Sequence, residues 1–342
     1  MNVGLHRSLP LAMWPAPDRT AWQELASAKA GLLDSTKAHQ LSPVTIQDLQ
    51  RRYGCFLNFA REQGCLQETP EAASVTESVV RAYIEWLAPR VASVTLAGSI
   101  RKILRVAELL NAERDWGWLR HYANRLEYHM RPRNKRPDVV DVRLLYRLGI
   151  DLMERAKQDA LSPGRKACLY RDGLLIAMLA ASALRLGAFM RLEIGKTFSF
   201  SGTFWTIHLP GTRGTKYKRP VEKPLPTDLS PFIDRWINVH RLHFRGARQH
   251  RRLWPSQKGI LTAGQAHRII AARTNETFGH RINPHLFRDC AVTTICTEFS
   301  AEAHLGSAVL DHIDPKTTAK HYNQAKMADA VKAYQRRMEL RD

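Results

Sequence analysis

The chain reads INPHLFRDCAVTT over residues 282–294 and LDHIDPKTTAKHYNQA over residues 310–325. These two stretches hold four side chains of interest, and a fifth lies far upstream: His285, Arg288, His312, Tyr322 and Arg185. Guanidinium and imidazole groups can hold the negative charge that develops at a phosphorus atom, and a phenol can attack that atom. Together these side chains form the set that phosphodiester chemistry requires.

Taken singly, these residues have simpler structural explanations. Arg185 ends an apolar helix, where it is either half of an ion pair or a side chain that needs an anion. His285 and Arg288 follow Asn283-Pro284, a helix start, so they lie in the first turns and near one face. They are either a capping histidine and a surface arginine, or two donors for a phosphate at a helix N-terminus.

Tyr322 and His312 also have two interpretations each. Tyr322 either packs at the edge of a following helix or acts as a phenol nucleophile. His312 is either structural or donates a hydrogen bond to a phosphate oxygen. The whole set, in this order, favours chemistry over packing.

The charge of the chain favours a polyanion as its partner. Its 342 residues hold 52 Lys and Arg against 32 Asp and Glu, a formal net charge of +20. Such a field attracts nucleic acid, because neutralising phosphates releases counterions. The most apolar stretch, residues 174–184, is far shorter than the roughly 20 residues that cross a bilayer, and no lipidation motif is present. We therefore expect no association with a membrane.

Cysteine usage and the N-terminus indicate the compartment. The five cysteines have no CxxC spacing, which fits a reducing cytosol better than a disulfide scaffold. The N-terminal stretch is broken by prolines and has no continuous apolar core, so it makes a poor signal peptide. These features predict a cytoplasmic protein.

The first part of the chain has the pattern of a helical bundle. Ser42-Pro43 is a helix-start signal, followed by apolar residues at helical spacing. Further helices are expected over 79–87 after a Thr76 cap, from Ser93 or Thr95 to Leu110, and over 118–128. The sequence thus predicts a helical domain over residues 36–128. Residues 1–35 are interpreted as an irregular N-terminal arm followed by a weak helix. They form either an arm-binding domain or a flexible, disordered arm.

A basic, proline-containing stretch separates the two halves. Residues 129–138 read HMRPRNKRPD, with two prolines, so we expect an exposed linker. It is either a solvated loop or a strap on a phosphate backbone, in which case four residues would bind DNA: Arg131, Arg133, Lys135 and Arg136.

Residues 139–342 form the second predicted domain. Helices are expected over 141–158, 166–185, 230–243, 263–277, 285–298 and 325–338. Residues 198–210, rich in aromatic and β-branched side chains, precede a glycine turn and predict a small antiparallel sheet. The fold class is therefore mainly α with a small antiparallel β-sheet. His240 and His243 have the spacing of half a metal site, but no cysteine or acidic residue accompanies them.

In this order the residues resemble the tyrosine recombinase family, the phage-integrase-type site-specific recombinases. Ala183-Leu184-Arg185 approximates the first arginine motif of the family, and His285-Leu-Phe-Arg288 matches its His-x-x-Arg box. The last box reads Leu310-Asp-His312, then Thr317-Thr318, then Tyr322. The resemblance implies a helical core-binding domain followed by a catalytic domain.

The resemblance also implies a catalytic lysine in a β-hairpin, several residues ahead of a Pro-Leu pair. Pro224-Leu225 supplies that pair, and counting back favours Lys216 over Lys218. At motif level the resemblance covers about residues 181–325, and it is much weaker over residues 40–128.

Four departures from the family pattern stand out. Ala188 occupies a position that is usually acidic, and Asp289 one where histidine is frequent. Asp311 replaces the glycine before the last histidine. The spacing from His312 to Tyr322 is one residue longer than usual, which puts the geometry of the nucleophile loop in question.

The family chemistry implies that Tyr322 attacks one phosphate in each of two staggered positions of duplex DNA. A 3′-phosphotyrosyl link forms and a 5′-hydroxyl leaves. Arg185 and Arg288 would clamp the non-bridging oxygens, whose charge rises in the transition state. A new 5′-hydroxyl can then reverse the step, which rejoins the strand to another partner.

The remaining residues would move or share protons. His285 would accept the tyrosine proton or hold the phosphate, and Lys216 would protonate the departing oxygen. His312 would donate a further hydrogen bond. Because the bond energy is kept in the ester, the resemblance implies neither ATP, nor a metal, nor any other cofactor.

The resemblance further implies partners. Double-stranded DNA with specific core sites would also be contacted by Lys218 and Arg219. A C-terminal helix over residues 325–340, with one apolar stripe, would dock on a neighbouring subunit of a tetrameric synapse: Met327, Val331, Tyr334 and Met338. Other recombinases or accessory DNA-bending proteins are further expected partners. The protein would be bacterial or phage-encoded, nucleoid-associated, and part of DNA integration or the transposition of a mobile element.

Two rival functions fit part of the sequence. A non-enzymatic, sequence-specific DNA-binding protein accounts for the charge and the helices, but not for a tyrosine after a His-x-x-Arg box. A topoisomerase is a nearer rival, because it uses the same tyrosine chemistry. It would relax plasmid DNA without strand exchange between two sites.

Overall fold

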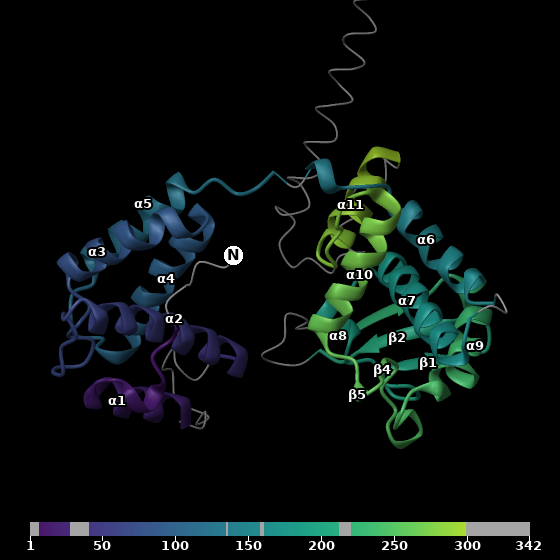
Figure 1. Cartoon of the computed structure of the whole chain (residues 1–342), viewed down its shortest axis with the longest axis horizontal. Helices are drawn as coiled ribbons and strands as arrows, with labels where there is room; N and C mark the ends of the chain where they lie inside the picture. Colours follow the sequence, from purple (N-terminus) through teal and green to yellow (C-terminus); the bar gives the residue numbers. More distant parts are fainter. Residues whose placement is uncertain (1–6, 28–40, 135, 158–160, 212–219, 299–342) are drawn as a thin grey trace, which may run out of the picture. The chain divides into compact units, whose positions relative to one another are not determined.

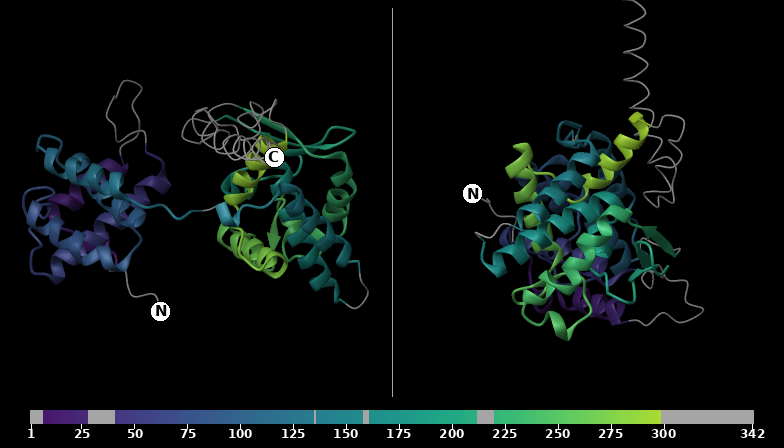
Figure 2. Two further views of the ribbon diagram at one scale, coloured as in Figure 1. Left: turned by 90° about the horizontal axis from the view of Figure 1, so that it is seen from above. Right: turned by 90° about the vertical axis from the view of Figure 1, so that its right-hand side faces the viewer.

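The computed structural model describes residues 7–27, 41–134, 136–157, 161–211 and 220–298 (Figure 1). The chain divides into two compact units, residues 1–134 and 135–342. The division thus falls inside the stretch 129–138. Figure 2 gives two further views, in which the strands of the described residues belong to the second unit.

The first unit is helical throughout its described residues. Its elements are η1 (Leu11–Met13), α1 (Ala16–Ser27), α2 (Pro43–Glu62), α3 (Glu77–Leu87), η3 (Ala88–Arg90), α4 (Ser93–Leu110) and α5 (Gly117–His129). The Ser42 hydroxyl caps α2 by accepting from the Thr45 amide at 3.2 Å, and the Thr76 hydroxyl caps α3 in the same way. The helix starts predicted at these two residues are confirmed.

Aromatic rings fill the core of the first unit. The Tyr83 ring meets those of Phe56 and Phe59 at centroid distances of 5.5 and 5.2 Å, and Trp14 meets Tyr53 at 5.1 Å. Such tilted and edge-on pairs stabilise a core by about 0.5–1.5 kcal/mol each beyond the area they bury.

Residues 7–27 belong to this core and are not a separate arm, so the interpretation of residues 1–35 was wrong for this part. Leu9, Trp14 and Trp22 are each 3% exposed or less. The Leu9 amide donates to the Gly54 carbonyl at 2.9 Å, and a Cβ on Gly54 would lie 2.8 Å from the Leu9 oxygen. Prolines interrupt the helical spacing of this stretch, and therefore the pattern did not reveal its packing.

The second unit is mainly helical with two small antiparallel sheets. Its helices are η4 (Arg136–Asp138), α6 (Val142–Arg155), α7 (Pro163–Ser182), α8 (Leu186–Phe189), η5 (Thr227–Leu229), α9 (Ser230–Asn238), η6 (His240–His243), η7 (Ala247–Gln249), α10 (Ala263–Phe278) and α11 (Leu286–Glu298). The sheets are β1 (Phe198–Phe200), β2 (Trp205–Leu209) and β3 (Val221–Pro224), in that order, and β4 (Pro255–Ser256) with β5 (Gly259–Ile260). The predicted fold class is confirmed.

Two predicted helices of this unit need comment. The helix expected over 230–243 is two elements, because the backbone at Val239 leaves the helical region with φ −122° and ψ −72°. The helix expected over 325–338 lies outside the described residues.

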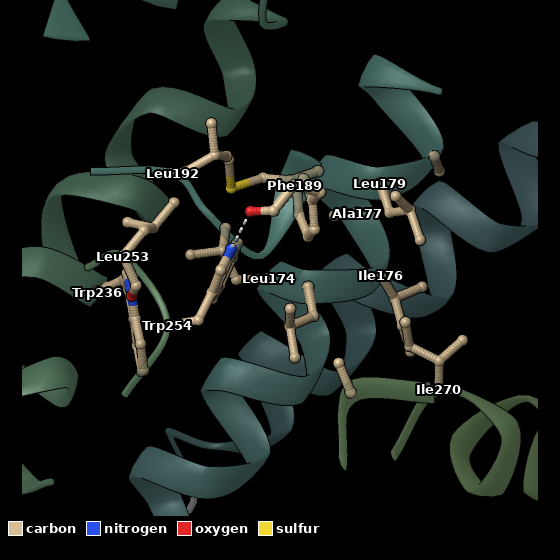
Figure 3. Packing of buried hydrophobic residues seen from close by; sticks show 14 of the residues in the cluster. Leu174, Ile176, Ala177, Leu179, Phe189, Leu192, Trp236, Leu253, Trp254 and Ile270 are labelled. Atoms are coloured by element: carbon tan, nitrogen blue, oxygen red, sulfur yellow. Dashed lines mark hydrogen bonds between the residues drawn. The ribbon is translucent and has the colours of Figure 1, made fainter. Parts of the chain in front are cut away.

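Helix α7 forms the centre of the second core. It is buried on nearly all sides, as expected for a helix surrounded by its own domain. Gly149 of α6 and Gly173 of α7 let the two backbones approach closely, since a Cβ on Gly149 would lie 2.6 Å from the Gly173 oxygen. Figure 3 shows part of this core from close by, where the indole nitrogen of Trp254 donates to the Phe189 carbonyl at 3.0 Å. These contacts fix α7 and the α8 turn that follows it.

Candidate active site

Arg185 emerges from a sharp turn at the end of α7. The helix ends at Ser182, and Ala183 adopts a left-handed conformation with φ 47° and ψ 31°. Glycine usually takes this position, because a side chain there costs about 1 kcal/mol or more. Arg185 is the N-cap residue of α8, and its carbonyl accepts from the Phe189 amide at 3.1 Å. Its side chain is half-buried.

His285 and Arg288 lie at the start of α11, as predicted. The Asn283 side chain accepts from the amides of His285 and Leu286 at 3.0 and 3.2 Å, which caps the helix. Leu286 and Phe287 are buried in the core, so the first turn of α11 is held by these two side chains as well as by the Asn283 cap. His285 is exposed, whereas Arg288 is only 3% exposed.

A direct hydrogen bond joins these two segments. The Arg288 Nη1 donates to the Ala183 carbonyl at 2.5 Å, across 105 positions of sequence. Arg288 therefore lies against the turn that presents Arg185, two residues further along. The left-handed backbone at Ala183 turns this carbonyl toward the guanidinium. Strain of this kind is frequent at functional sites.

The departures Ala188 and Asp289 lie beside these residues. Ala188 sits in the short helix α8 and is 6% exposed, so its methyl group packs inward. An acidic side chain at this position would need a polar partner in the same buried space. Asp289 follows Arg288 in the first turn of α11, where a negative charge is favourable.

The other residues of the predicted set divide into two groups. Arg131 and Arg133 are exposed in the extended chain after α5, and the Ser93 hydroxyl accepts from the Arg131 amide at 2.9 Å. Six of the others lie outside the described residues: Lys135, Lys216, Lys218, Arg219, His312 and Tyr322. The backbone of Arg136 is described, but its side chain is not.

A buried ionic cluster was missed by the sequence reasoning. Asp172 of α7 accepts from Arg171 through one carboxylate oxygen, at 2.8 Å, and from Arg273 of α10 through the other, at 2.9 Å. Asp172 and Arg171 are 4% and 7% exposed. An Arg-Asp pair inside an otherwise apolar helix was the available signal, because buried charges are retained only when they are paired. The cluster ties together the two helices that lead to Arg185 and to His285.

Two other reactive side chains of the unit are held in a neutral form. Burial raises the pKa of the Cys290 thiol to about 11, so this residue stays protonated and is a poor nucleophile. Burial also lowers the pKa of His240 to about 4, with its ring stacked on Tyr170 at 4.1 Å. In the described part of the chain, no group of three or more His, Cys, Asp or Glu side chains could hold a metal ion.

Comparison with known proteins identifies the fold. No family model matches the sequence, and no curated protein matches it. The structure resembles XerH site-specific recombinase bound to its difH substrate in a pre-cleavage complex, with a TM-score of 0.58 and 13% identity. That match covers 96% of this chain and 99% of the other. It also resembles the Tn1549 transposon integrase in complex with transposon right-end DNA, with a TM-score of 0.55, 13% identity and coverage of 92% and 98%.

The chain therefore shares its fold with this recombinase and this integrase over nearly its full length. At such identities the likeness concerns the fold. None of the described helices is long and apolar enough to cross a membrane.

Proposed function

We propose that this chain is a site-specific DNA recombinase that cleaves and rejoins duplex DNA through a 3′-phosphotyrosyl intermediate. The observation that carries the proposal is the hydrogen bond from Arg288 to Ala183, beside Arg185. In the proposal, two guanidinium groups from segments far apart in sequence would serve one anion. The shared fold with XerH and the Tn1549 integrase, both solved with DNA, supports the same reading.

The arginines would act by fixed charge. Arg288 is held by burial and by its bond to a backbone carbonyl, so its guanidinium group is already oriented when a phosphate arrives. Arg185 would bind the second non-bridging oxygen. Together they favour the transition state, because the phosphoryl oxygens carry more charge there than in the ground state.

The other groups would handle the nucleophile and the leaving group. His285 is exposed at the helix start, where it can accept the phenol proton or donate to the phosphate. In this proposal Tyr322 forms the ester, Lys216 protonates the 5′-oxygen as it leaves, and His312 adds a hydrogen bond. No ATP enters the proposed reaction, because the tyrosyl ester keeps the energy of the broken bond. No metal enters it either, because the cationic side chains would stabilise the phenolate and the transition state.

The proposal extends to the organisation of the chain. Residues 36–128 would bind the core site, residues 129–138 would strap the DNA backbone, and residues 139–342 would hold the catalytic domain. The helix over residues 325–340 would dock on a neighbouring protomer of a tetramer. We place the reaction in the bacterial cytoplasm, at the nucleoid, in the service of a mobile element.

Trapping the covalent intermediate tests this function. The full chain is incubated with nicked duplexes cut from the DNA that flanks its gene. A nick just downstream of the cleaved phosphate lets the short fragment with the free 5′-hydroxyl diffuse away, which stops religation. We expect a protease-sensitive adduct that forms in EDTA and is absent in Tyr322→Phe. The matched control is Tyr128→Phe, which removes a hydroxyl from an exposed tyrosine of the first unit.

The rival functions predict different results. A non-enzymatic DNA-binding protein would retard the same duplexes and give no adduct in any variant. A topoisomerase would form the adduct and relax plasmids of any sequence, without joining two sites. Strand exchange between two copies of one site, lost in Tyr322→Phe, supports the recombinase.

A further inference from the structure

A second concave site lies in the second unit, between the first half of α7, the β4–β5 hairpin and the start of α10. The pocket encloses about 400 Å³. Arg171 comes from α7, Ser256 and Lys258 from the hairpin, and Arg268 from α10. Arg171 precedes Arg185 by 14 residues, most of them helical, which corresponds to roughly 20 Å. The pocket is therefore separate from the candidate active site.

Arg171 offers a fixed donor at the base of this pocket. Its Nε and Nη2 both donate to Asp172, at 3.1 and 2.8 Å, and no described residue accepts from its Nη1. The side chain is 7% exposed, and its guanidinium also lies over the Phe244 ring at 5.2 Å. Its position is thus set before any ligand arrives.

Two neutral side chains present donors to the same space. Ser256 is 6% exposed, and its hydroxyl accepts from the Lys258 amide at 3.3 Å, while no described residue accepts its proton. The amide oxygen of Gln265 accepts from the backbone and hydroxyl of Thr262, both at 2.9 Å. Its amide nitrogen is therefore left as the group that can serve a ligand.

The rim adds charge that is not compensated. Lys258 and Arg268 are exposed, and neither forms an ion pair with any described residue. No carboxylate lines the pocket, although Leu261 and Ile269 give it an apolar wall. The fitting ligand is an anion with several acceptor oxygens and a less polar body beside them.

We propose that this pocket binds the phosphate of a phosphate ester. A tetrahedral phosphate can accept from a guanidinium, a hydroxyl and an amide that approach from three elements, whereas a carboxylate has only two oxygens to share. The ester is either a phosphodiester of duplex DNA or a nucleoside monophosphate, and both combine a phosphate with a sugar that can pack on the apolar wall. The inference does not depend on tyrosine chemistry.

Protection of Cys168 from alkylation tests the proposal. Cys168 lines the pocket and is partly exposed, and Cys65 in the first unit is exposed and serves as the internal reference for the two small probes. For the duplex, the reference is Cys168 in the double variant Lys258→Glu/Arg268→Glu. The full-length Tyr322→Phe variant is treated with iodoacetamide at low salt, and labelling is read by peptide mass spectrometry. The probes are inorganic phosphate, adenosine monophosphate and a mixed-sequence duplex. The proposal is supported if a probe slows the labelling of Cys168 and leaves the labelling of the reference cysteine unchanged.

The three probes distinguish the source of the phosphate. Protection by the duplex alone assigns a DNA phosphodiester, and protection by adenosine monophosphate or inorganic phosphate assigns a small ligand. Because Tyr322→Phe is used throughout, a failure of the proposed cleavage reaction leaves this result untouched.

Charge reversal supplies the second readout, by calorimetric titration of the same probes. The double variant Lys258→Glu/Arg268→Glu is expected to weaken binding by at least about tenfold without loss of the folded state. Arg248→Glu is the matched control, since Arg248 is exposed on the same unit outside the pocket. Two results overturn the proposal: no probe slows the alkylation of Cys168, or Arg248→Glu weakens the binding of each probe as much as the double variant does.

Discussion

Both units bury aromatic rings in their cores, but they differ in the number of charged side chains that they bury. Within the described residues, the first unit buries aromatic rings and a single charged side chain, Asp18. The second unit buries five: Arg171, Asp172, Lys223, Arg241 and Arg288. Residues 1–134 contain 17 Lys and Arg against 13 Asp and Glu, whereas residues 135–342 contain 35 against 19.

This difference indicates which unit has a use for fixed charge. A core with few buried charges needs few ionic partners, which suits a unit that presents a surface. Buried guanidinium groups are costly unless they are paired, so a unit that keeps several of them has a use for fixed charge. Most of the excess positive charge is also in the second unit, where the proposed phosphate contacts are.

The largest expected effect comes from breaking the buried ionic cluster. Asp172→Ala leaves Arg171 buried without its carboxylate, and should destabilise the second unit by about 3–5 kcal/mol. Hydrogen exchange of α7 and α10 peptides measures this, with the first unit as internal reference. Asp151→Ala, at an exposed position of α6, is the control and should change stability by less than about 0.5 kcal/mol. Equal effects of the two substitutions would contradict the structural role of the cluster.

Arg288→Lys should have the next largest effect, on activity. The lysine keeps the charge but loses the fork that serves a phosphate and the Ala183 carbonyl together. We expect adduct formation to slow by about 10²–10³-fold, with duplex affinity little changed. Arg281→Lys, at an exposed position ahead of α11, is the control. Normal adduct formation by Arg288→Lys would remove Arg288 from the proposed site.

Close helix packing gives a smaller effect in the same unit. Gly149→Ala places a methyl group against the Gly173 backbone and should cost about 1–3 kcal/mol. Gly164→Ala, on α7 with no heavy atom within 4 Å of the added Cβ, should be neutral or stabilise by up to about 1 kcal/mol. The free energy of unfolding of the second unit is compared in the two variants by denaturant titration, with hydrogen exchange of α6 and α7 peptides as the readout. A neutral Gly149→Ala would mean that α6 and α7 are not closely packed.

The smallest expected effect is a pH dependence confined to the first unit. Burial raises the pKa of Asp18, although its carboxylate accepts from the Tyr53 hydroxyl and the Ala72 amide. The folded state therefore binds this proton more tightly than the unfolded state, and the stability it contributes is lost as pH rises through the raised pKa.

Asp18→Asn tests this sign. The wild-type first unit should lose stability relative to Asp18→Asn as pH rises from acid to neutral, by about 1.4 kcal/mol for each unit by which the pKa is raised. Exchange of α2 peptides measures the difference. A pH profile that is identical in the two proteins would show that Asp18 does not titrate in this way.

Local signals predicted much of the fold, because they act over a few residues. Ser42, Thr76 and Asn283 cap helices through their own side chains, and these starts were visible in the sequence. The small sheet was likewise visible as a run of aromatic and β-branched residues.

Tertiary effects were not predicted. Trp14 and Trp22 complete a core whose other walls come from later helices, and no spacing within residues 7–27 announces this. The burial of Asp172 depends on Arg273, about a hundred residues away. For the site, the sequence singled out Arg185, His285 and Arg288, but only folding brings Arg288 against the turn at Ala183. The roles of Lys216, His312 and Tyr322 stay predictions.

The structure of Tyr322→Phe bound to an uncleaved target duplex is the most direct test of the account. We predict that the guanidinium groups of Arg185 and Arg288 donate to the same backbone phosphate, at about 2.7–2.9 Å from its non-bridging oxygens, with the ring of residue 322 behind the phosphorus. Arginines that contact different phosphates, or a residue 322 that lies away from both, would contradict it.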